Sequence, residues 1–406
     1  MNLLLKSRLS IMMFLQFFIW GGWYVTMGTF LANNLDANDN QIGMAYSTQS
    51  WGAIIAPFVF GLIADRFFNA ERLLGVIHLI GAILMYYCYQ AVDFTNFYSA
   101  ILPYMVLYMP TLALVNSVSF RQMDDPSKDF SQIRVWGTVG WIVAGLAISF
   151  LFSWDNSQSI KNGLLKNTFL MSGIASLLLG LYSFSLPATP PGGKGSGVNL
   201  RQILGLDALG LLKDRNYLVF FLASVLICIP LAFYYQNANL FLTEIEVPDA
   251  TGKMTIGQGS EVLFMLLLPL FLKKYGMKKT LLAGMLAWGI RYACFAFGDA
   301  DGAIYLVMVG IALHGVCYDF FFVAGQIYTD SKAGEKIQSA AQGLITLATY
   351  GLGMLVGFWA AGKISNLYVE NGGHDWMMIW LAPSIFALGV LLLFWVSFKN
   401  EKVSYD

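Results

Sequence analysis

Four charged residues lie well inside long apolar stretches of this 406-residue chain: Arg134, Glu261, Arg291 and Asp319. A charged side chain at the centre of a membrane helix costs about 2.5–3.5 kcal/mol on insertion scales, so each should be paired or functional. A carboxylate in such surroundings can bind and release protons near neutral pH, which is the chemistry expected of Glu261 and Asp319. Arg134 offers a fixed fork of N–H donors, which suits a ligand rich in hydroxyl groups or bearing a carboxylate.

The depths of these residues indicate how they pair. Arg291 and Asp319 lie in consecutive apolar stretches, at depths that differ by one helical turn or less. We therefore expect Asp319 to be held near Arg291, as a structural ion pair, as a proton site, or as both. Glu261 has no evident partner in its own helix, and the neighbouring Gly257 and Gly259 favour a cavity beside it.

The composition indicates a membrane protein. Hydrophobic residues make up 57% of the chain and charged residues only 12%, about half the charged fraction of a soluble domain. Apolar runs of 18 or more residues recur along the whole length, as in membrane helices. Lys6 and Arg8 precede the first run, which has no small-residue cleavage site after it, so we expect a retained membrane helix. The net charge is zero, which gives no reason to expect a nucleic-acid partner.

We predict twelve membrane-spanning helices, so that both termini lie on one side. Their expected ranges are 9–33, 43–64, 73–91, 98–120, 131–153, 166–186, 216–243, 252–272, 280–297, 303–327, 337–362 and 376–398. Most Lys and Arg residues then fall on the side of the termini, which the positive-inside rule makes the cytoplasm. The long polar stretch 187–215 is predicted to link two six-helix bundles, residues 1–186 and 216–406. Glycines in the spans at 131–153 and 337–362 favour close helix packing.

Several stretches resemble a known family. "GLIADRFFNAER" (61–72) is similar to the conformational motif of the major facilitator superfamily. "FLQFFIWGGWYVTMGTF", "YMPTLALVNSVSF", "IRVWGTVGW", "LGLDALGLLKD" and "CYDFFFVAG" resemble, in the same order, the bacterial nucleoside:proton symporters within it. The resemblance implies an all-α fold of two six-helix halves with a substrate site where the halves meet. It implies proton-coupled nucleoside uptake by alternating access in a monomer of the inner membrane.

The resemblance also implies roles for individual residues. It places Arg134, Thr138 and Trp141 against the nucleoside, with Gln258 and Glu261, and it links Asp319 to proton coupling. The further candidates for substrate contact are Gln16, Trp20, Asn116, Tyr235, Gln236, His314 and Tyr318, the candidate partner in proton coupling is Arg291, and the conformational motif is Gly61, Asp65 and Arg66.

The chain departs from the family in two spans. Ala232 and Tyr235 stand where the family places a glutamine and an asparagine, unless the register shifts to Gln236 and Asn237, and His314 replaces a tyrosine. A transporter of another small polar solute, such as a sugar or a cell-wall fragment, therefore stays open as the alternative.

Other functional classes lack their motifs. HExxH and GxSxG, which would indicate a membrane enzyme, are absent, as is the nucleotide-binding motif of a primary pump. No soluble sensor domain interrupts the spans, which argues against a receptor. The four cysteines and three histidines show no metal-ligand spacing, so we expect neither a metal nor a cofactor. His78, alone on an apolar face, is expected to be a hydrogen-bonded structural residue.

Overall fold

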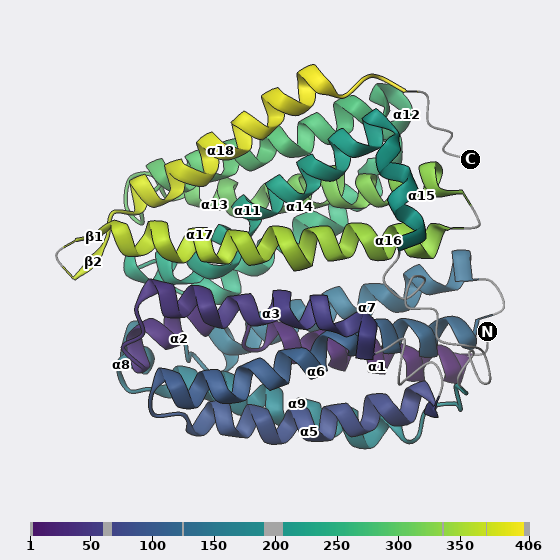
Figure 1. Ribbon diagram of the computed structural model, residues 1–406. Coiled ribbons are helices and arrows are strands. Elements are labelled where there is room, and N and C mark those ends of the chain that lie inside the picture. The colour runs from purple at the N-terminus through teal and green to yellow at the C-terminus, as the bar shows by residue number, and fades with distance from the viewer. Residues whose placement is uncertain are drawn as a thin grey trace. The chain divides into compact units, whose positions relative to one another are not determined.

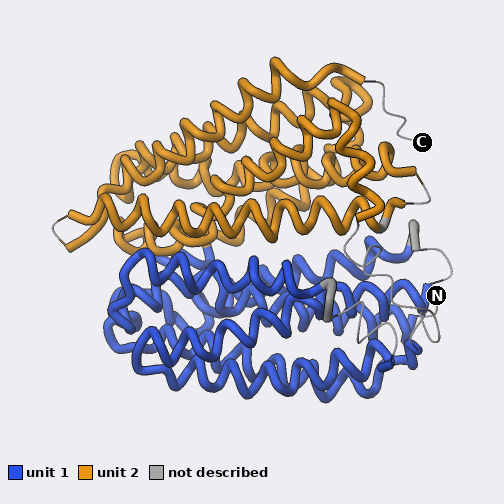
Figure 2. The backbone as a smooth tube through the Cα atoms, viewed as in Figure 1, with its two compact units in different colours: residues 1–199, 248–252 blue, residues 200–247, 253–406 orange. Residues whose placement is uncertain are grey.

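The computed structural model describes residues 3–59, 67–123, 126–190, 206–334, 337–370 and 372–401, and most of them are helical (Figure 1). The chain divides into two compact units (Figure 2). Unit 1 consists of residues 1–199 and 248–252, and unit 2 of residues 200–247 and 253–406. The predicted motif residues Gly61, Asp65 and Arg66 lie outside the described residues, as does the middle of the predicted linker, 191–205.

Unit 1 is a bundle of helices. Its elements are α1 (Leu3–Gly21), α2 (Met27–Asn34), α3 (Asp39–Val59), α5 (Ala70–Gln90), α6 (Phe94–Arg121), α7 (Pro126–Leu146), η2 (Ala147–Leu151), α8 (Ser157–Lys161), η3 (Leu164–Lys166) and α9 (Asn167–Ser183). Asp93 caps α6 by accepting a 2.8 Å hydrogen bond from the Asn96 N–H, which satisfies one of the N–H groups left open at a helix start.

Close packing of α1 on α7 shapes unit 1. A Cβ atom added at Gly140 of α7 would collide with the carbonyl oxygen of Phe14 on α1, and one added at Gly137 would lie 2.6 Å from the Phe17 ring. The absence of side chains at these two positions lets the helix backbones approach closely. The packing role predicted for these glycines is confirmed.

Unit 2 is a second helical bundle with one short hairpin. Its elements are η4 (Leu206–Lys213), α11 (Arg215–Glu244), α12 (Ala250–Phe297), α13 (Ile304–Ala312), α14 (His314–Tyr318), η5 (Asp319–Val323), α15 (Ala324–Ala333), α16 (Gln338–Thr346), η6 (Leu347–Gly353), α17 (Met354–Leu367), β1 (Val369–Glu370), β2 (Gly373–His374) and α18 (Trp376–Ser397). The strands β1 and β2 pair antiparallel. Gly357 lets α17 pack on α11, because an added Cβ would lie 2.6 Å from that of Ala232.

Three π-helical segments interrupt the helices: η2, η5 and η6. Such segments leave backbone groups out of the regular ladder and are frequent at functional sites. The segment η5 begins at Asp319, so the predicted proton-carrying residue stands where α14 changes its winding.

The first turn of α12 belongs to unit 1 because its open N–H groups find acceptors there. The Thr251 N–H donates to Asp155 Oδ2 at 3.0 Å, and the Gly252 N–H donates to Ser149 Oγ at 2.7 Å. Asp155 also accepts a 2.5 Å hydrogen bond from the Ser149 hydroxyl. A helix N-terminus favours a carboxylate in this position.

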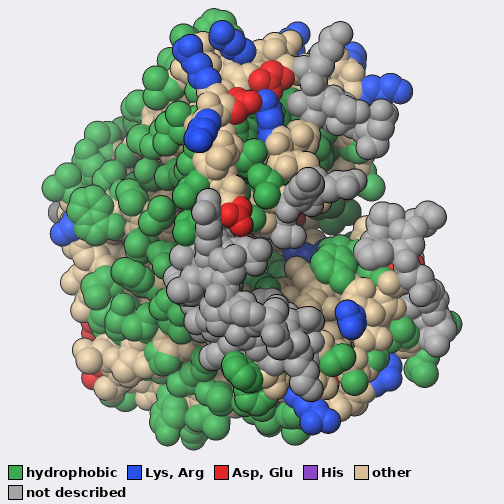
Figure 3. All heavy atoms as spheres, turned by 45° about the vertical axis from the view of Figure 1, so that its right-hand side comes forward, with side chains coloured by type: hydrophobic (Ala, Val, Ile, Leu, Met, Phe, Trp, Pro, Cys, Tyr) green, Lys and Arg blue, Asp and Glu red, His purple; other side chains and the backbone are tan. Residues whose placement is uncertain are grey.

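Ten helical stretches of the described residues are long and apolar enough to cross a membrane. Large hydrophobic side chains face outward on them, such as Leu266 on α12 and Val396 on α18. On the face drawn in Figure 3 they form a broad flank, and most Lys and Arg side chains gather away from it. Helices that expose this much apolar surface need lipid around them.

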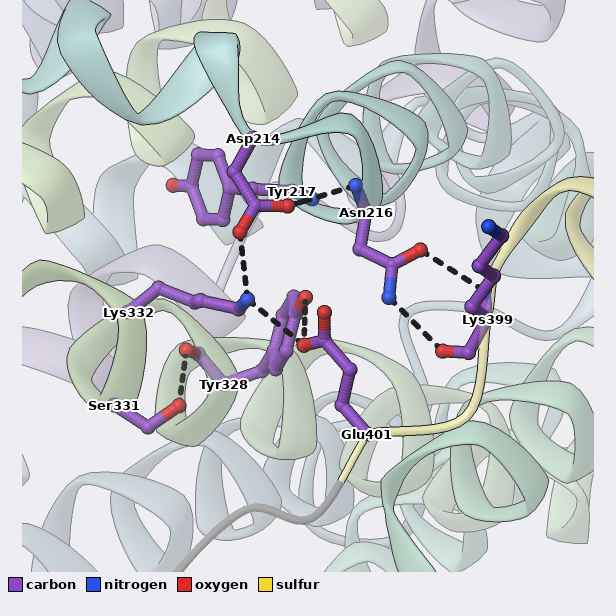
Figure 4. A network of polar contacts seen from close by, with 8 residues as sticks. All are labelled: Asp214, Asn216, Tyr217, Tyr328, Ser331, Lys332, Lys399 and Glu401. Carbon is purple, nitrogen blue, oxygen red and sulfur yellow. Dashed lines mark hydrogen bonds and ion pairs between the residues drawn. The ribbon is translucent and has the colours of Figure 1, made fainter.

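The chain after α18 is fastened to two helix ends of unit 2 (Figure 4). The ammonium group of Lys332 lies 2.8 Å from carboxylate oxygens of both Asp214 and Glu401. Asp214 also caps α11 through the N–H groups of Asn216 and Tyr217. The Asn216 amide and the backbone of Lys399 exchange two hydrogen bonds. The hydrogen bond from Lys332 keeps the pKa of the Asp214 carboxyl below its ordinary value.

Replacement of Lys332 by Met should therefore lower the thermal stability of the purified protein at neutral pH. The loss should be modest, about 1 kcal/mol, because Asp214 is partly exposed. A carboxyl whose pKa is lowered by folding stabilises the fold above its unfolded pKa, and this contribution disappears as the pH falls through the folded-state value. The difference in Tm between wild type and variant should thus shrink below about pH 4.

Lys399 provides the matched control, because its backbone and not its side chain bonds Asn216. Lys399→Met should have the same Tm as the wild type, both at neutral pH and in acid. Equal Tm values for Lys332→Met and Lys399→Met at pH 7 would show that the ion pairs contribute nothing.

Candidate substrate and proton sites

Arg291 of α12 is completely buried in unit 2 and is held mainly by aromatic faces. Its guanidinium carbon lies 3.6 Å from the centre of the Tyr234 ring and within 5.7 Å of the Trp288 and Phe295 rings. Its Nη1 makes a 2.9 Å hydrogen bond with His314 Nδ1, while Nε and Nη2 have no hydrogen-bond partner among the described residues. Cation–π contacts of this kind are worth about 2 kcal/mol when desolvated.

His314 brings Glu261 into the same group. Its Nε2 lies 3.8 Å from a Glu261 carboxylate oxygen, and 19% of the Glu261 side chain is exposed. The two helices are close here because Gly315 lacks a side chain: an added Cβ would lie 2.5 Å from the Ser260 carbonyl. The Gly315 N–H donates to Ser260 Oγ at 2.9 Å. Glu261 therefore has a neighbour from another helix, which the sequence had not indicated.

The predicted pair between Arg291 and Asp319 is not formed. The Asp319 side chain is fully buried, and both of its carboxylate oxygens lack a hydrogen-bond partner within the described residues. Depth along the helix was a poor guide to pairing, because His314 and Asp319 are five residues apart and so point about 140° apart around one helix. It is His314 that turns toward Arg291.

Tyr318 and Gln258 extend this cluster. The rings of His314 and Tyr318 lie 5.8 Å apart, and the Tyr318 hydroxyl is 2.6 Å from that of Tyr350 on η6. Gln258 is half-buried and precedes Glu261 by three residues on α12, a spacing that puts the two on one helix face. Unit 2 thus brings together five of the predicted residues, counting Arg291 with Gln258, Glu261, His314 and Tyr318.

Burial distinguishes the polar residues of α11. Gln236 is 1% exposed, and its amide, with the oxygen and nitrogen assigned to suit their surroundings, faces Phe358 O and Gly362 N of α17 at 3.3 Å. Asn237 donates to Ser365 Oγ at 3.0 Å. The amide of Gln236 is therefore bonded inside the bundle, and its contact with substrate stays a prediction. Tyr235, in the same turn of α11, is half-buried, whereas Gln236 and Asn237 are buried.

In unit 1, the predicted residues of α7 meet an aromatic cluster on α1. The Trp141 ring lies 5.5 Å from that of Trp20, and the Arg134 guanidinium lies 4.1 Å above the Phe17 ring. Thr138 stands one turn from both Arg134 and Trp141, hence on the same face of α7. This face offers a cation, a hydroxyl and indole rings, which are suitable groups for a polar molecule with an aromatic ring.

The side chain of Gln16 is hydrogen-bonded inside unit 1. Its amide nitrogen donates to Thr111 Oγ1 at 2.7 Å, and its amide oxygen lies 2.9 Å from His78 Nε2. The other His78 nitrogen is 3.0 Å from Ser176 Oγ, so His78 is the hydrogen-bonded structural residue that we predicted. Gln16 is fully buried, and its contact with substrate stays a prediction. Asn116 lies half-buried on α6.

Two aromatic residues of the unit 2 cluster were not predicted. Tyr234 supplies the face beneath Arg291, and Tyr350 holds the Tyr318 hydroxyl. Tyr350 lies in a glycine-rich stretch that sequence analysis assigned to packing alone. A sequence signal for Tyr234 existed, since it neighbours Tyr235 in a span expected to face the substrate.

Comparisons with known proteins cover nearly the whole chain. The family model described as nucleoside H⁺ symporter matches residues 1–403. The chain is 42% identical to "Putative nucleoside transporter YegT" of Escherichia coli K12, over 97% of this chain and 94% of that protein. It is 34% identical to the xanthosine permease of the same organism, over 97% and 96%. The crystal structure of the nucleoside transporter NupG matches with a TM-score of 0.87 and 30% identity, over 99% of this chain and 100% of that one. The helical transporter fold predicted from the sequence is thereby confirmed.

The close approach at Gly315 yields a stability test. Gly315→Ala should destabilise the purified protein by about 1–3 kcal/mol, since the new methyl group forces α12 and α14 apart. Thermal unfolding in detergent measures the loss. Gly389→Ala is the matched control, because a Cβ at that helical glycine meets nothing within 4 Å, and it should be neutral or slightly stabilising. Equal Tm values for the two variants would refute the close packing.

Proposed function

Because the chain belongs to the nucleoside H⁺ symporter family, we infer that it is a secondary active transporter that moves a nucleoside together with protons. It is a multi-pass membrane protein. We further propose that it works as a monomer in the cytoplasmic membrane of a bacterium and uses the inward proton gradient to concentrate the nucleoside. It needs no cofactor for this, since the driving force is the gradient itself.

The proposal includes twelve crossings of the membrane with both termini in the cytoplasm. The helix α12 has 48 residues and a break at Gly276, whose φ of 75° is not helical. A straight helix of that length would extend about 70 Å, more than twice the ~30 Å hydrocarbon core, so we count α12 as two crossings. We count α3, which is less apolar, as one more. The distribution of Lys and Arg supports the cytoplasmic side for the termini.

For nucleoside recognition we propose the half-buried groups of each unit. In unit 1 these are Arg134, Thr138 and the indole rings of Trp20 and Trp141. In unit 2 they are Gln258, Tyr235 and Tyr318. Stacking on a ring and hydrogen bonds to base and ribose are the contacts that a nucleoside requires, and base stacking on an aromatic ring is worth about 1–3 kcal/mol.

For proton coupling we propose the carboxyl groups of Asp319 and Glu261. The observation that supports this most is the complete burial of Asp319 without a hydrogen-bond partner in the described part of the chain. An ionised carboxylate is very costly in such a place, so the arrangement favours the protonated form. Loss of that proton requires a change of surroundings, which is the link between proton release and helix movement that a symporter uses.

Uptake into proteoliposomes tests the transport proposal. With an imposed inward proton gradient, the protein should accumulate at least one of radiolabelled uridine, adenosine and inosine. Collapse of the gradient with a protonophore should abolish the accumulation. If none of these accumulates while a sugar such as maltose does, the substrate belongs to the alternative class and the nucleoside assignment is wrong.

Two substitutions test the proton sites. Asp319→Asn should reduce the accumulation ratio to about 1 while leaving nucleoside exchange measurable, because binding remains but the gradient no longer acts. Glu261→Gln should impair accumulation. It should also raise the Kd for nucleoside about tenfold, because one charge-assisted hydrogen bond is lost.

Asp301→Asn, in the exposed loop before α13, is the matched control and should accumulate nucleoside like the wild type. Gradient-driven accumulation by Asp319→Asn would show that Asp319 is not a coupling site.

A further inference from the structure

The imidazole of His314 stands between the buried cation and the half-buried carboxylate of unit 2. Its Nδ1 is 2.9 Å from Arg291 Nη1, and its Nε2 is 3.8 Å from Glu261 Oε2. The ring itself is 2% exposed. His314 therefore connects Arg291 to Glu261, although 30 residues of α12 separate the two.

The chemistry of arginine fixes the tautomer of this ring. A guanidinium has five N–H donors and no acceptor, so His314 Nδ1 must accept from Arg291 and carries no proton. In the neutral imidazole the proton then resides on Nε2, the nitrogen that faces Glu261. An imidazolium would have to abandon the Arg291 hydrogen bond and place two cations side by side in a buried site.

Two tyrosine rings flank the imidazole. The ring of Tyr234, on α11, is stacked 5.5 Å away, and that of Tyr318, on α14, is 5.8 Å away. Titratable residues close to these in sequence are Tyr235 on α11, Cys317 on α14 and Asp319 on η5. Gly257 packs against the His314 Cβ, which restricts movement of the ring toward α12.

We propose that His314 is a positioning residue for proton coupling, locked by Arg291 as a neutral Nε2–H donor that holds the ionised form of Glu261. This inference rests on the proposed function, in which Glu261 takes up a proton. When Glu261 is ionised, its carboxylate closes on the Nε2–H and accepts from it. When a proton from water binds Glu261, the charge that draws the two groups together is gone, and the carboxyl is released.

The proposal predicts how uptake responds to pH. His314→Asn leaves an oxygen in the place of Nδ1, so Arg291 keeps its acceptor, but no donor reaches Glu261. The carboxylate then loses stabilisation of its charged form and keeps its proton to a higher pH. The pH of half-maximal uptake should rise by about 0.5–1 unit. His314→Gln, whose longer amide can accept from Arg291 and donate toward Glu261, should move this pH back toward the wild-type value.

Three outcomes distinguish the possibilities. An unshifted pH profile in His314→Asn would overturn the proposal and leave His314 as a packing residue. A flat profile in both variants would also overturn it, because His314 itself would then carry the proton. Failure of the wild type to accumulate any nucleoside would instead refute the proposed function, and the inference would fall with it.

The tautomer can be measured directly on the wild-type protein. The chain contains only three histidines, so the ¹⁵N signals of His314 in protein labelled at histidine are assigned by their loss in His314→Asn. We expect the neutral Nε2–H form from pH 5 to pH 8. A protonated ring within this range, or a proton on Nδ1, would contradict the proposal even if the variants transport poorly.

Discussion

The guanidinium of Arg291 is the constraint on which the arrangement of unit 2 depends. It is a permanent cation that can only donate hydrogen bonds, and it is buried completely. The guanidinium contacts the π face of Tyr234 and makes one hydrogen bond, to Nδ1 of His314. That one hydrogen bond decides which imidazole nitrogen carries the proton and so which group faces Glu261. Within the described residues, neither carboxylate oxygen of Asp319 has a hydrogen-bond partner, so its ionised form is costly there.

The polar interior of unit 1 offers a useful contrast, because a chain of hydrogen bonds between uncharged groups runs through it. The Ser176 hydroxyl donates to the His78 carbonyl oxygen, the His78 Nε2–H can donate to Gln16, Gln16 donates to Thr111, and Thr111 donates to the Tyr108 carbonyl, all over 2.6–2.9 Å. This chain connects α1, α5, α6 and α9 without a charge. Satisfied networks of this kind make a bundle rigid. In unit 2, by contrast, the Asp319 oxygens have no hydrogen-bond partner among the described residues, so burial favours the protonated carboxyl group. We therefore expect the two units to differ in role.

The sequence predicted the apolar helices and the charges within them. It did not predict which side chains face one another, because that depends on how each helix is rotated about its axis. Hydropathy predicted long apolar helices, of which the described residues contain ten, and singled out Glu261, Arg291 and Asp319 as charges within them. Their partners could not be predicted, because a depth along the axis leaves the direction of a side chain open by a full turn. His314 and Asp319 differ by about 140°, and it is His314 that bonds Arg291. Tyr235 and Gln236 differ by about 100°, and of the two only Tyr235 is half-buried. Tyr350 gave no signal, since its role follows only from the position of η6 beside α14.

The measurement that tests the central claim most directly is the flux of protons and nucleoside in the same proteoliposomes. A nucleoside gradient is imposed with no proton gradient, and a pH-sensitive dye in the lumen reports proton entry. The account predicts that nucleoside flowing inward acidifies the lumen of wild-type vesicles, because each transport cycle carries both species. Nucleoside entry without any acidification would contradict it, since the buried carboxyls of unit 2 would then have no part in transport.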